Sequence, residues 1–306
     1  MSLQVNGLDI VQNNPKPQMY TTFKANPIAT TNTLERTPTT DTLVKLTQNK
    51  TKKTLLTLGA IVLAGIGIFA AIKAGKAHQQ KKAIQEIEKK FADLQNDMPK
   101  VQKTFKEVFL REDLTEKEAL EMLNRYKDVE KIRITGSKEE YAKAIFNEAK
   151  NNYGFANTAL EISYKDFSSV GQAGSYTPTH SEVIISSHSH VNRLMNTIHH
   201  ELRHVKQSYL AINAKPKQYV KALHGNDEAL KRIITEEAVL KPFNLTKPNK
   251  KLVSNNYNTF IENVIEGAKN RHTYSGYGEA YHTNITEVDA RFAGESIAKL
   301  FGLMAK

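Results

Sequence analysis

A long run of uncharged residues near the N-terminal end restricts most strongly what this chain can fold into. Residues 54–72 carry no charge, with Lys52 and Lys53 before them and Lys73 and Lys76 after them. As a helix this run would be about 28 Å long, close to the thickness of a bilayer's hydrocarbon core. A buried core helix is the alternative. Because the run is uncharged on every face and lysines flank both ends, it favours a single transmembrane helix.

The segments on either side of this run complete a prediction of domain organisation. Residues 1–53 are polar, rich in Thr, Asn, Gln and Pro, and show no sustained period, so we expect a disordered tail. So long a tail argues against a cleaved signal peptide. We expect residues 73–130 to form a helical stalk and N-terminal helices, and residues 131–306 to form the main domain. More lysines follow the run than precede it, which favours a single-pass membrane protein with a cytoplasmic C-terminal domain.

The composition limits the chemistry that the chain can perform. It contains no cysteine and ten histidines. Disulfides, thiolate zinc sites and cysteine nucleophiles are excluded, so nitrogen and oxygen must hold any bound metal. The formal net charge is +11 and the sequence pI is near 9.4. The lysines are scattered, with few aromatic or arginine clusters among them, and this pattern does not favour nucleic acid as a partner.

Local patterns predict both helices and strands, and hence an α+β fold class. Thr115 and Ser137 are each followed three residues later by a glutamate, which is the spacing of a capping box at a helix start. Residues 158–164 alternate in polarity and are expected as a strand. Residues 181–186 are rich in β-branched side chains and are expected as a second strand.

A helix with two histidines on one face is expected after the second strand. Its apolar residues recur at helical spacing: Val191, Leu194, Met195, Ile198, Leu202 and Val205. His200 and His204 lie four residues apart, so their rings project from neighbouring turns of one face. Two imidazoles placed in this way can bind one Zn²⁺ and leave room for a third protein ligand and a water molecule. The alternative is two ordinary surface histidines on a helix.

Glu201 stands beside the first of these histidines. At a metal site it would serve as the general base that takes a proton from the activated water during attack on a peptide carbonyl. His199 is also adjacent, but it lies about 100° around the helix and is expected to face elsewhere. Three more histidines precede the helix and are expected to be solvated loop residues: His180, His188 and His190.

Residues 197–207 (T-I-H-H-E-L-R-H-V-K-Q) resemble the active helix of the zincin (HExxH) zinc metallopeptidases. They are most similar to bacterial domains whose helix reads H-E-L-x-H-x-x-Q, including metallopeptidase domains attached to toxins. Residues 176–185 resemble the edge strand that lines the zincin cleft and pairs with extended substrate. The resemblance implies a zincin-like domain with a small sheet, an active-site helix and a helical lower subdomain. Arg203 is a departure, because zincin helices usually carry an uncharged residue there.

The third metal ligand must come from farther along the chain. Gln207 and Leu210 exclude the metzincin spacing, which places Gly and then His or Asp at those positions. Residues 285–293 are expected to open a helix with Thr286 as N-cap. They resemble the glutamate-containing helix of the gluzincin-like ImmA/IrrE-type zinc peptidases, which implies that Glu287 is the third ligand.

The pattern around Glu287 agrees with this assignment but leaves alternatives open. Glu287, Ala290 and Gly294 share one helix face, and the two small residues would let this helix approach the histidine helix closely. Glu287 could instead only complement the helix dipole. Arg291 stands where gluzincins of the E-x-x-x-D kind carry the Asp that orients the first histidine, so that role is unassigned. Other carboxylates stay open as the third ligand: Asp289, Glu279, Glu236 and Glu237.

These patterns together predict a membrane-anchored zinc peptidase that hydrolyses peptide bonds in a protein or peptide substrate. A toxin or effector metallopeptidase is a variant of this function. The alternative from another class is a catalytically weak or inactive zincin-fold protein that acts as a membrane-anchored binding module or scaffold. Four residues are candidates for stabilising the oxyanion, and the sequence does not single out one of them: Tyr274, Tyr277, Tyr281 and His282.

Overall fold

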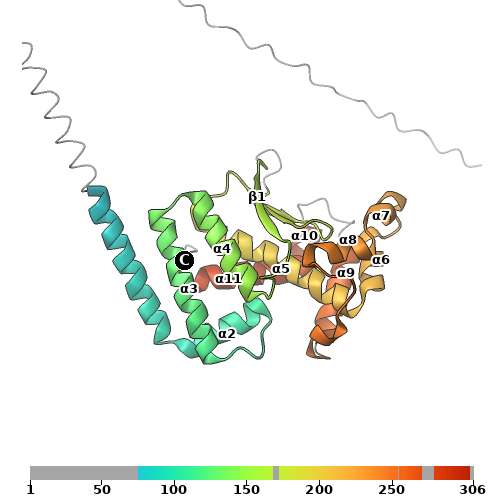
Figure 1. Cartoon of the computed structure of the whole chain (residues 1–306), viewed down its shortest axis with the longest axis horizontal. Coiled ribbons are helices and arrows are strands. Elements are labelled where there is room, and N and C mark those ends of the chain that lie inside the picture. Colours follow the sequence, from blue (N-terminus) through green and yellow to red (C-terminus); the bar gives the residue numbers. More distant parts are fainter. Residues whose placement is uncertain (1–74, 168–171, 254, 271–278, 304–306) are drawn as a thin grey trace, which may run out of the picture. The chain divides into compact units, whose positions relative to one another are not determined.

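The computed structural model describes residues 75–167, 172–253, 255–270 and 279–303. They belong to the second of two units into which the chain divides, Phe69–Lys306. The described part is mostly helical and contains a three-stranded sheet (Figure 1). The segments predicted as a disordered tail and as a transmembrane helix lie outside the described residues.

The prediction of a membrane-spanning protein is corrected here. Crossing a bilayer takes about 20 consecutive, predominantly apolar residues. Helices α3 (Glu116–Thr135) and α5 (Leu194–Ala214) have that length, but both carry charged side chains along their spans. Among the described residues, no helix combines the length and the apolar character that a bilayer requires. This finding contradicts the predicted single transmembrane helix, and with it the membrane as a partner, the single-pass localisation and the cytoplasmic placement. The described part of the chain is mostly helical with a small sheet.

Two of the N-terminal helices of this part, α3 and α4, begin where their capping residues predict. Residues 75–95 are helical and are followed by α2 (Met98–Phe109), α3 and α4 (Lys138–Asn152). Complete capping boxes start α3 at Thr115 and α4 at Ser137, because each hydroxyl accepts from a backbone N–H and the glutamate three residues later accepts from the cap. The capping-box predictions are confirmed.

The sheet consists of β1 (Glu161–Lys165), β2 (Gly174–Tyr176) and β3 (Glu182–Ser186), in the spatial order β1-β3-β2. β3 pairs in parallel with β1 and antiparallel with β2. The strand expected at 158–164 is shifted towards its C-terminal end, and the one expected at 181–186 is β3. The segment that resembles a zincin edge strand is therefore divided, since β2 forms an edge and β3 is the central strand.

The remaining helices surround α5 and α11. After α5 the chain forms α6 (Pro216–His224), α7 (Glu228–Ile233), α8 (Glu236–Leu240), α9 (Asn258–Asn270) and α10 (Glu279–Thr283), and then α11 (Ile285–Leu300). Short 3₁₀ turns lie at Val191–Arg193, Lys241–Phe243, Lys250–Leu252 and Asn255–Tyr257. Of the described elements, α11 packs most extensively on α5, and α2, α4, α6 and α9 add contacts to this pair (Figure 1).

Two local features bring α11 into its place beside α5. A Cβ atom on Gly294 would lie 2.3 Å from Asn196 Oδ1 and 2.5 Å from the Asn196 carbonyl oxygen, so only glycine permits this approach. Asn284 caps the helix by accepting from the Thr286 N–H, which corrects the prediction of Thr286 as the N-cap. Asn284 Nδ2 also donates to the Gly267 carbonyl, and this bond to α9 favours Asn284 as the cap.

Candidate metal site

Three side chains from two helices converge on one point. His200 and His204 lie one turn apart on α5, and Glu287 lies in the first turn of α11. The two histidine Nε2 atoms are 3.2 Å apart. Glu287 Oε2 lies 3.4 Å from His200 Nε2, and Glu287 Oε1 lies 3.5 Å from His204 Nε2. The three residues each offer one ligand atom within 4.8 Å of the others and could hold a metal ion.

The separations of these donor atoms fit a tetrahedral ion. Zn²⁺ binds His nitrogen and carboxylate oxygen at about 2.0–2.2 Å, and tetrahedral ligand atoms at such bond lengths lie about 3.3–3.5 Å from one another. An octahedral Mg²⁺ site, with bonds of about 2.0–2.1 Å, would place neighbouring donors only about 2.9 Å apart. Two imidazole nitrogens with one carboxylate also differ from the oxygen donors that Mg²⁺ and Ca²⁺ prefer.

The electrostatics of the group also favour a cation. Glu287 Oε2 is buried and has no hydrogen-bond partner among the described residues. Burial opposes the charge of Glu287, but His204 and His200 outweigh it and hold the pKa of this carboxyl well below its usual range. Burial likewise opposes a charge on His204, but Glu287 outweighs it and raises the pKa of His204 to about 9. A divalent ion between these donors would compensate the buried carboxylate.

Glu201 lies beside this group and is almost fully buried. Burial raises its pKa, His200 and His204 oppose this, and Glu287 adds to it. The edge strand β2 passes directly alongside, because a Cβ atom on Gly174 would lie 2.9 Å from Glu201 Oε1. The absence of a side chain at Gly174 therefore leaves room for the Glu201 carboxylate.

The other carboxylates that the sequence leaves open do not join the histidines. Asp289 accepts hydrogen bonds of 2.7 Å from both Nε and Nη2 of Arg203, so both of its oxygens are engaged by this buried guanidinium. Glu279 begins α10, and Glu236 and Glu237 lie in the first turn of α8. Among the described residues, the group of possible ligands at His200 and His204 is completed by Glu287 and by none of these four.

The other histidines of the sequence have separate environments. His199 is fully buried among aromatic rings of the core, and its Nε2 lies 3.0 Å from the Tyr126 hydroxyl. Burial lowers the pKa of His199 to about 3, so it stays neutral. The prediction that it faces away from the metal ligands is confirmed. The three histidines before the helix are exposed, as expected: His180, His188 and His190.

One of the four oxyanion candidates lies next to the proposed ligands. Tyr274 and Tyr277 lie outside the described residues. His282 Nδ1 accepts from Arg291, which also binds the His282 carbonyl. The Tyr281 hydroxyl is hydrogen-bonded to Glu287, and burial together with the charges of Glu287 and Glu201 raises its pKa. Tyr281 is therefore a protonated donor beside the metal site.

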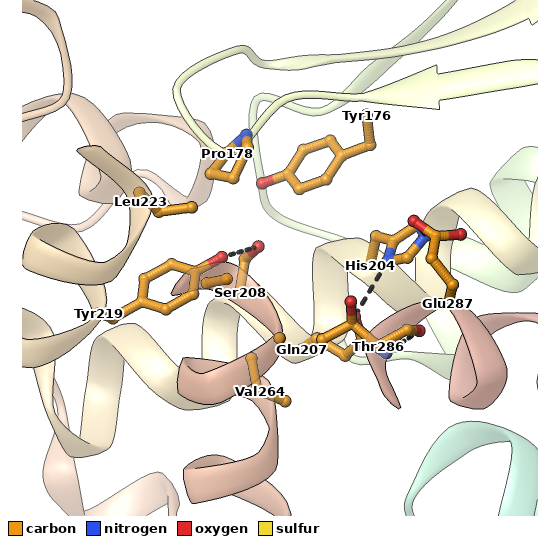
Figure 2. Close-up of a pocket in the computed structure, with 12 residues that line it drawn as sticks. Tyr176, Pro178, His204, Gln207, Ser208, Tyr219, Leu223, Val264, Thr286 and Glu287 are labelled. Carbon is orange, nitrogen blue, oxygen red and sulfur yellow. Dashed lines mark hydrogen bonds and ion pairs between the residues drawn. The ribbon is translucent and has the colours of Figure 1, made fainter. Parts of the chain in front are cut away.

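A cavity of about 90 Å³ adjoins His204 and Glu287. Figure 2 shows these two residues at one end of the cavity and the Ser208–Tyr219 hydroxyl pair, 2.7 Å apart, at the other. Its remaining walls come from β2 and the turn after it, α6, α9 and α11: Tyr176, Pro178, Gln207, Leu223, Val264, Gly267, Ala268 and Thr286. The cavity offers room for a small side chain of a bound molecule next to the metal ligands.

Comparisons with known proteins add no relative to this picture. No protein-family model, curated protein or solved structure matches the chain. The resemblance to the zincins therefore rests on the residues of the HExxH helix and of the helix that carries Glu287. The function must be argued from the geometry of these residues.

Proposed function

We propose that the protein is a zinc-dependent peptidase of the zincin type, which hydrolyses peptide bonds in a protein or peptide substrate. The observation that carries this proposal is the convergence of two imidazole nitrogens and one carboxylate at 3.2–3.5 Å, with Glu201 beside them. Catalytic zinc sites typically have three protein ligands and one open coordination position, whereas structural zinc sites have four protein ligands.

The chain's own residues divide the chemistry between them. Bound zinc would lower the pKa of a water molecule to about 7 and polarise the substrate carbonyl. Glu201 accepts the proton of the attacking water and later transfers it to the leaving amine. The position of Glu201 suits this role, because it is buried directly beside His200 and His204 and can therefore reach a water molecule held by the metal.

Two neighbouring features support a peptide as the substrate. β2 is an edge strand of the sheet and runs past Glu201, so an extended peptide that pairs with its outer edge would present its backbone to the general base. We infer that Tyr281, which is protonated and lies next to Glu287, donates a hydrogen bond to the oxyanion that forms on the attacked carbonyl. The Arg291 guanidinium lies 5.7 Å from the centre of the Tyr281 ring and holds α10 against α11.

The proposal is tested on the purified full-length protein by zinc analysis and by cleavage of a peptide library. We expect stoichiometric zinc in the wild type and in Glu201→Gln, and a loss of cleavage of about 10²–10⁴-fold in Glu201→Gln. Glu236→Gln makes the same change at an α8 carboxylate away from the site and should cleave like the wild type. Equal cleavage by Glu201→Gln and the wild type would overturn the mechanism. Stoichiometric zinc without any cleavage by the wild type would identify a binding module instead.

A further inference from the structure

A series of hydrogen bonds leads from the proposed metal ligand His204 to a salt bridge between α5 and α11. Gln207 is 2% exposed, and its Oε1 lies 2.9 Å from His204 Nδ1. Its Nε2 donates to the Thr286 carbonyl at 2.9 Å and to Asp289 Oδ2 at 2.7 Å. Figure 2 shows Gln207 between His204 and Thr286. Asp289 in turn is held by the two hydrogen bonds from Arg203.

The chemistry of these groups permits a single arrangement of protons. The Thr286 carbonyl and the Asp289 carboxylate only accept hydrogen bonds, so Gln207 must turn its NH₂ group towards them. Its amide oxygen then faces His204, and because this oxygen can only accept, His204 must carry its proton on Nδ1. In the neutral imidazole that binds a metal, the lone pair of His204 is consequently on Nε2, the atom that faces His200 and Glu287.

Arg203 is the anchor of this series. It is 2% exposed, and its Nη1 donates to the carbonyl oxygens of Glu107 and Val108 at 3.1 and 2.6 Å, at the end of α2. Its guanidinium is thus fixed by α2 on one side and by Asp289 on the other. A buried ion pair by itself is weak grounds for stability. The position of this ion pair points to a role at the proposed metal site. Arg203 directly precedes the ligand His204, and Asp289 lies two residues after the ligand Glu287.

We propose that Arg203, Asp289 and Gln207 form one positioning unit that sets the tautomer and the ring orientation of His204 for metal binding. The inference rests on the proposed metal site and adds to it the residues that prepare it. It gives a role to Arg203, which stands where zincin helices usually carry an uncharged residue. It also supplies an orienting carboxylate in a chain that has Arg291 at the position where gluzincins carry the orienting Asp. In this chain the orienting carboxylate is Asp289, and it acts on the second histidine through an amide.

The test measures zinc affinity of the full-length protein by competition with a chromophoric chelator. Gln207→Leu removes the amide that accepts from His204 and donates to Thr286 and Asp289. We expect zinc affinity to fall by about 10–100-fold. Asp289→Asn keeps the size of the side chain but can present either a donor or an acceptor to Gln207, so it should cause a smaller loss in the same direction. It also serves as the second variant if Gln207→Leu does not fold.

The matched control is Asn213→Leu, on the same helix. Asn213 is fully buried and bonds the Tyr209 carbonyl and the Asn249 N–H, so its loss removes similar hydrogen bonds away from the ligands. We expect lower stability but wild-type zinc affinity. Wild-type affinity in folded Gln207→Leu and Asp289→Asn, or an equal loss in Asn213→Leu, would overturn the positioning role. No saturable zinc binding by the wild type would instead overturn the proposed function together with it.

Discussion

The candidate metal site depends on how closely α11 approaches α5, and Gly294 sets that distance. A Cβ atom there would lie 2.3 Å from Asn196 Oδ1 and 2.5 Å from the Asn196 carbonyl oxygen. The amide side chain can turn away, but the carbonyl belongs to the backbone of α5. Gly294→Ala must therefore separate the helices by about 0.9 Å, because the contact of 2.5 Å has to lengthen to the 3.4 Å at which ordinary van der Waals contact begins. Overpacking of this kind costs about 1–3 kcal/mol.

Gly75 provides the matched control, because it is also helical and a Cβ atom there would meet nothing within 4 Å. Alanine favours a helix over glycine by about 0.5–1 kcal/mol, so Gly75→Ala should leave the free energy of unfolding unchanged or higher. Gly294→Ala should lower it in urea unfolding and weaken zinc binding, because Glu287 moves away from His200 and His204. A Gly294→Ala protein as stable as Gly75→Ala, with unchanged zinc affinity, would refute the close approach.

Two further predictions concern single side chains near the site. Tyr281→Phe should lower kcat for peptide cleavage by about 10²–10³-fold at saturating zinc. Tyr257→Phe loses a bond to a backbone carbonyl away from the ligands and should keep the wild-type kcat. Equal kcat in both variants would exclude Tyr281 as the oxyanion donor. Burial lowers the pKa of His199 from 6.5 to about 3. Between these two pH values His199 is therefore protonated in the unfolded chain and neutral in the native chain. The free energy of unfolding should therefore decrease as the pH falls from 6.5 towards 3, by about 1.4 kcal/mol per pH unit from this residue. His199→Phe removes that contribution, so a wild-type-minus-variant difference that is the same at pH 4 and pH 6.5 in urea titrations would contradict it.

The part of the site that lies within one helix could be predicted from the sequence. Residues four apart on a helix must share a face, so the pairing of His200 with His204 follows from local geometry alone. The same period places His199 on another face, where it is buried in the core. Glu287 was reached through its resemblance to a peptidase helix, and the structure brings it to the two histidines.

The parts that depend on distant pairs could not be predicted. Arg203 departs from the zincin pattern, and the sequence alone does not explain it, because its partner Asp289 is 86 residues away. Asn284 and Thr286 are both good N-caps, and a contact with α9 decides between them. β2 spans only Gly174–Tyr176, which is too short to show a strand period. The membrane prediction came from the hydropathy of residues 54–72 alone, and the described helices do not support it.

The contacts between α5 and α11 also determine what metal binding requires of this chain. The Arg203–Asp289 salt bridge and the packing at Gly294 join the two helices through residues other than the proposed ligands. We therefore expect these contacts to help hold the donors of His200, His204 and Glu287 at their separations of 3.2–3.5 Å. In small zinc domains the metal supplies the folding energy and the apo chain is unfolded. Under the proposed function, we therefore expect the free energy of zinc binding to do little to order the ligands in this chain, and a prepared site of this kind is what catalysis by a single ion requires.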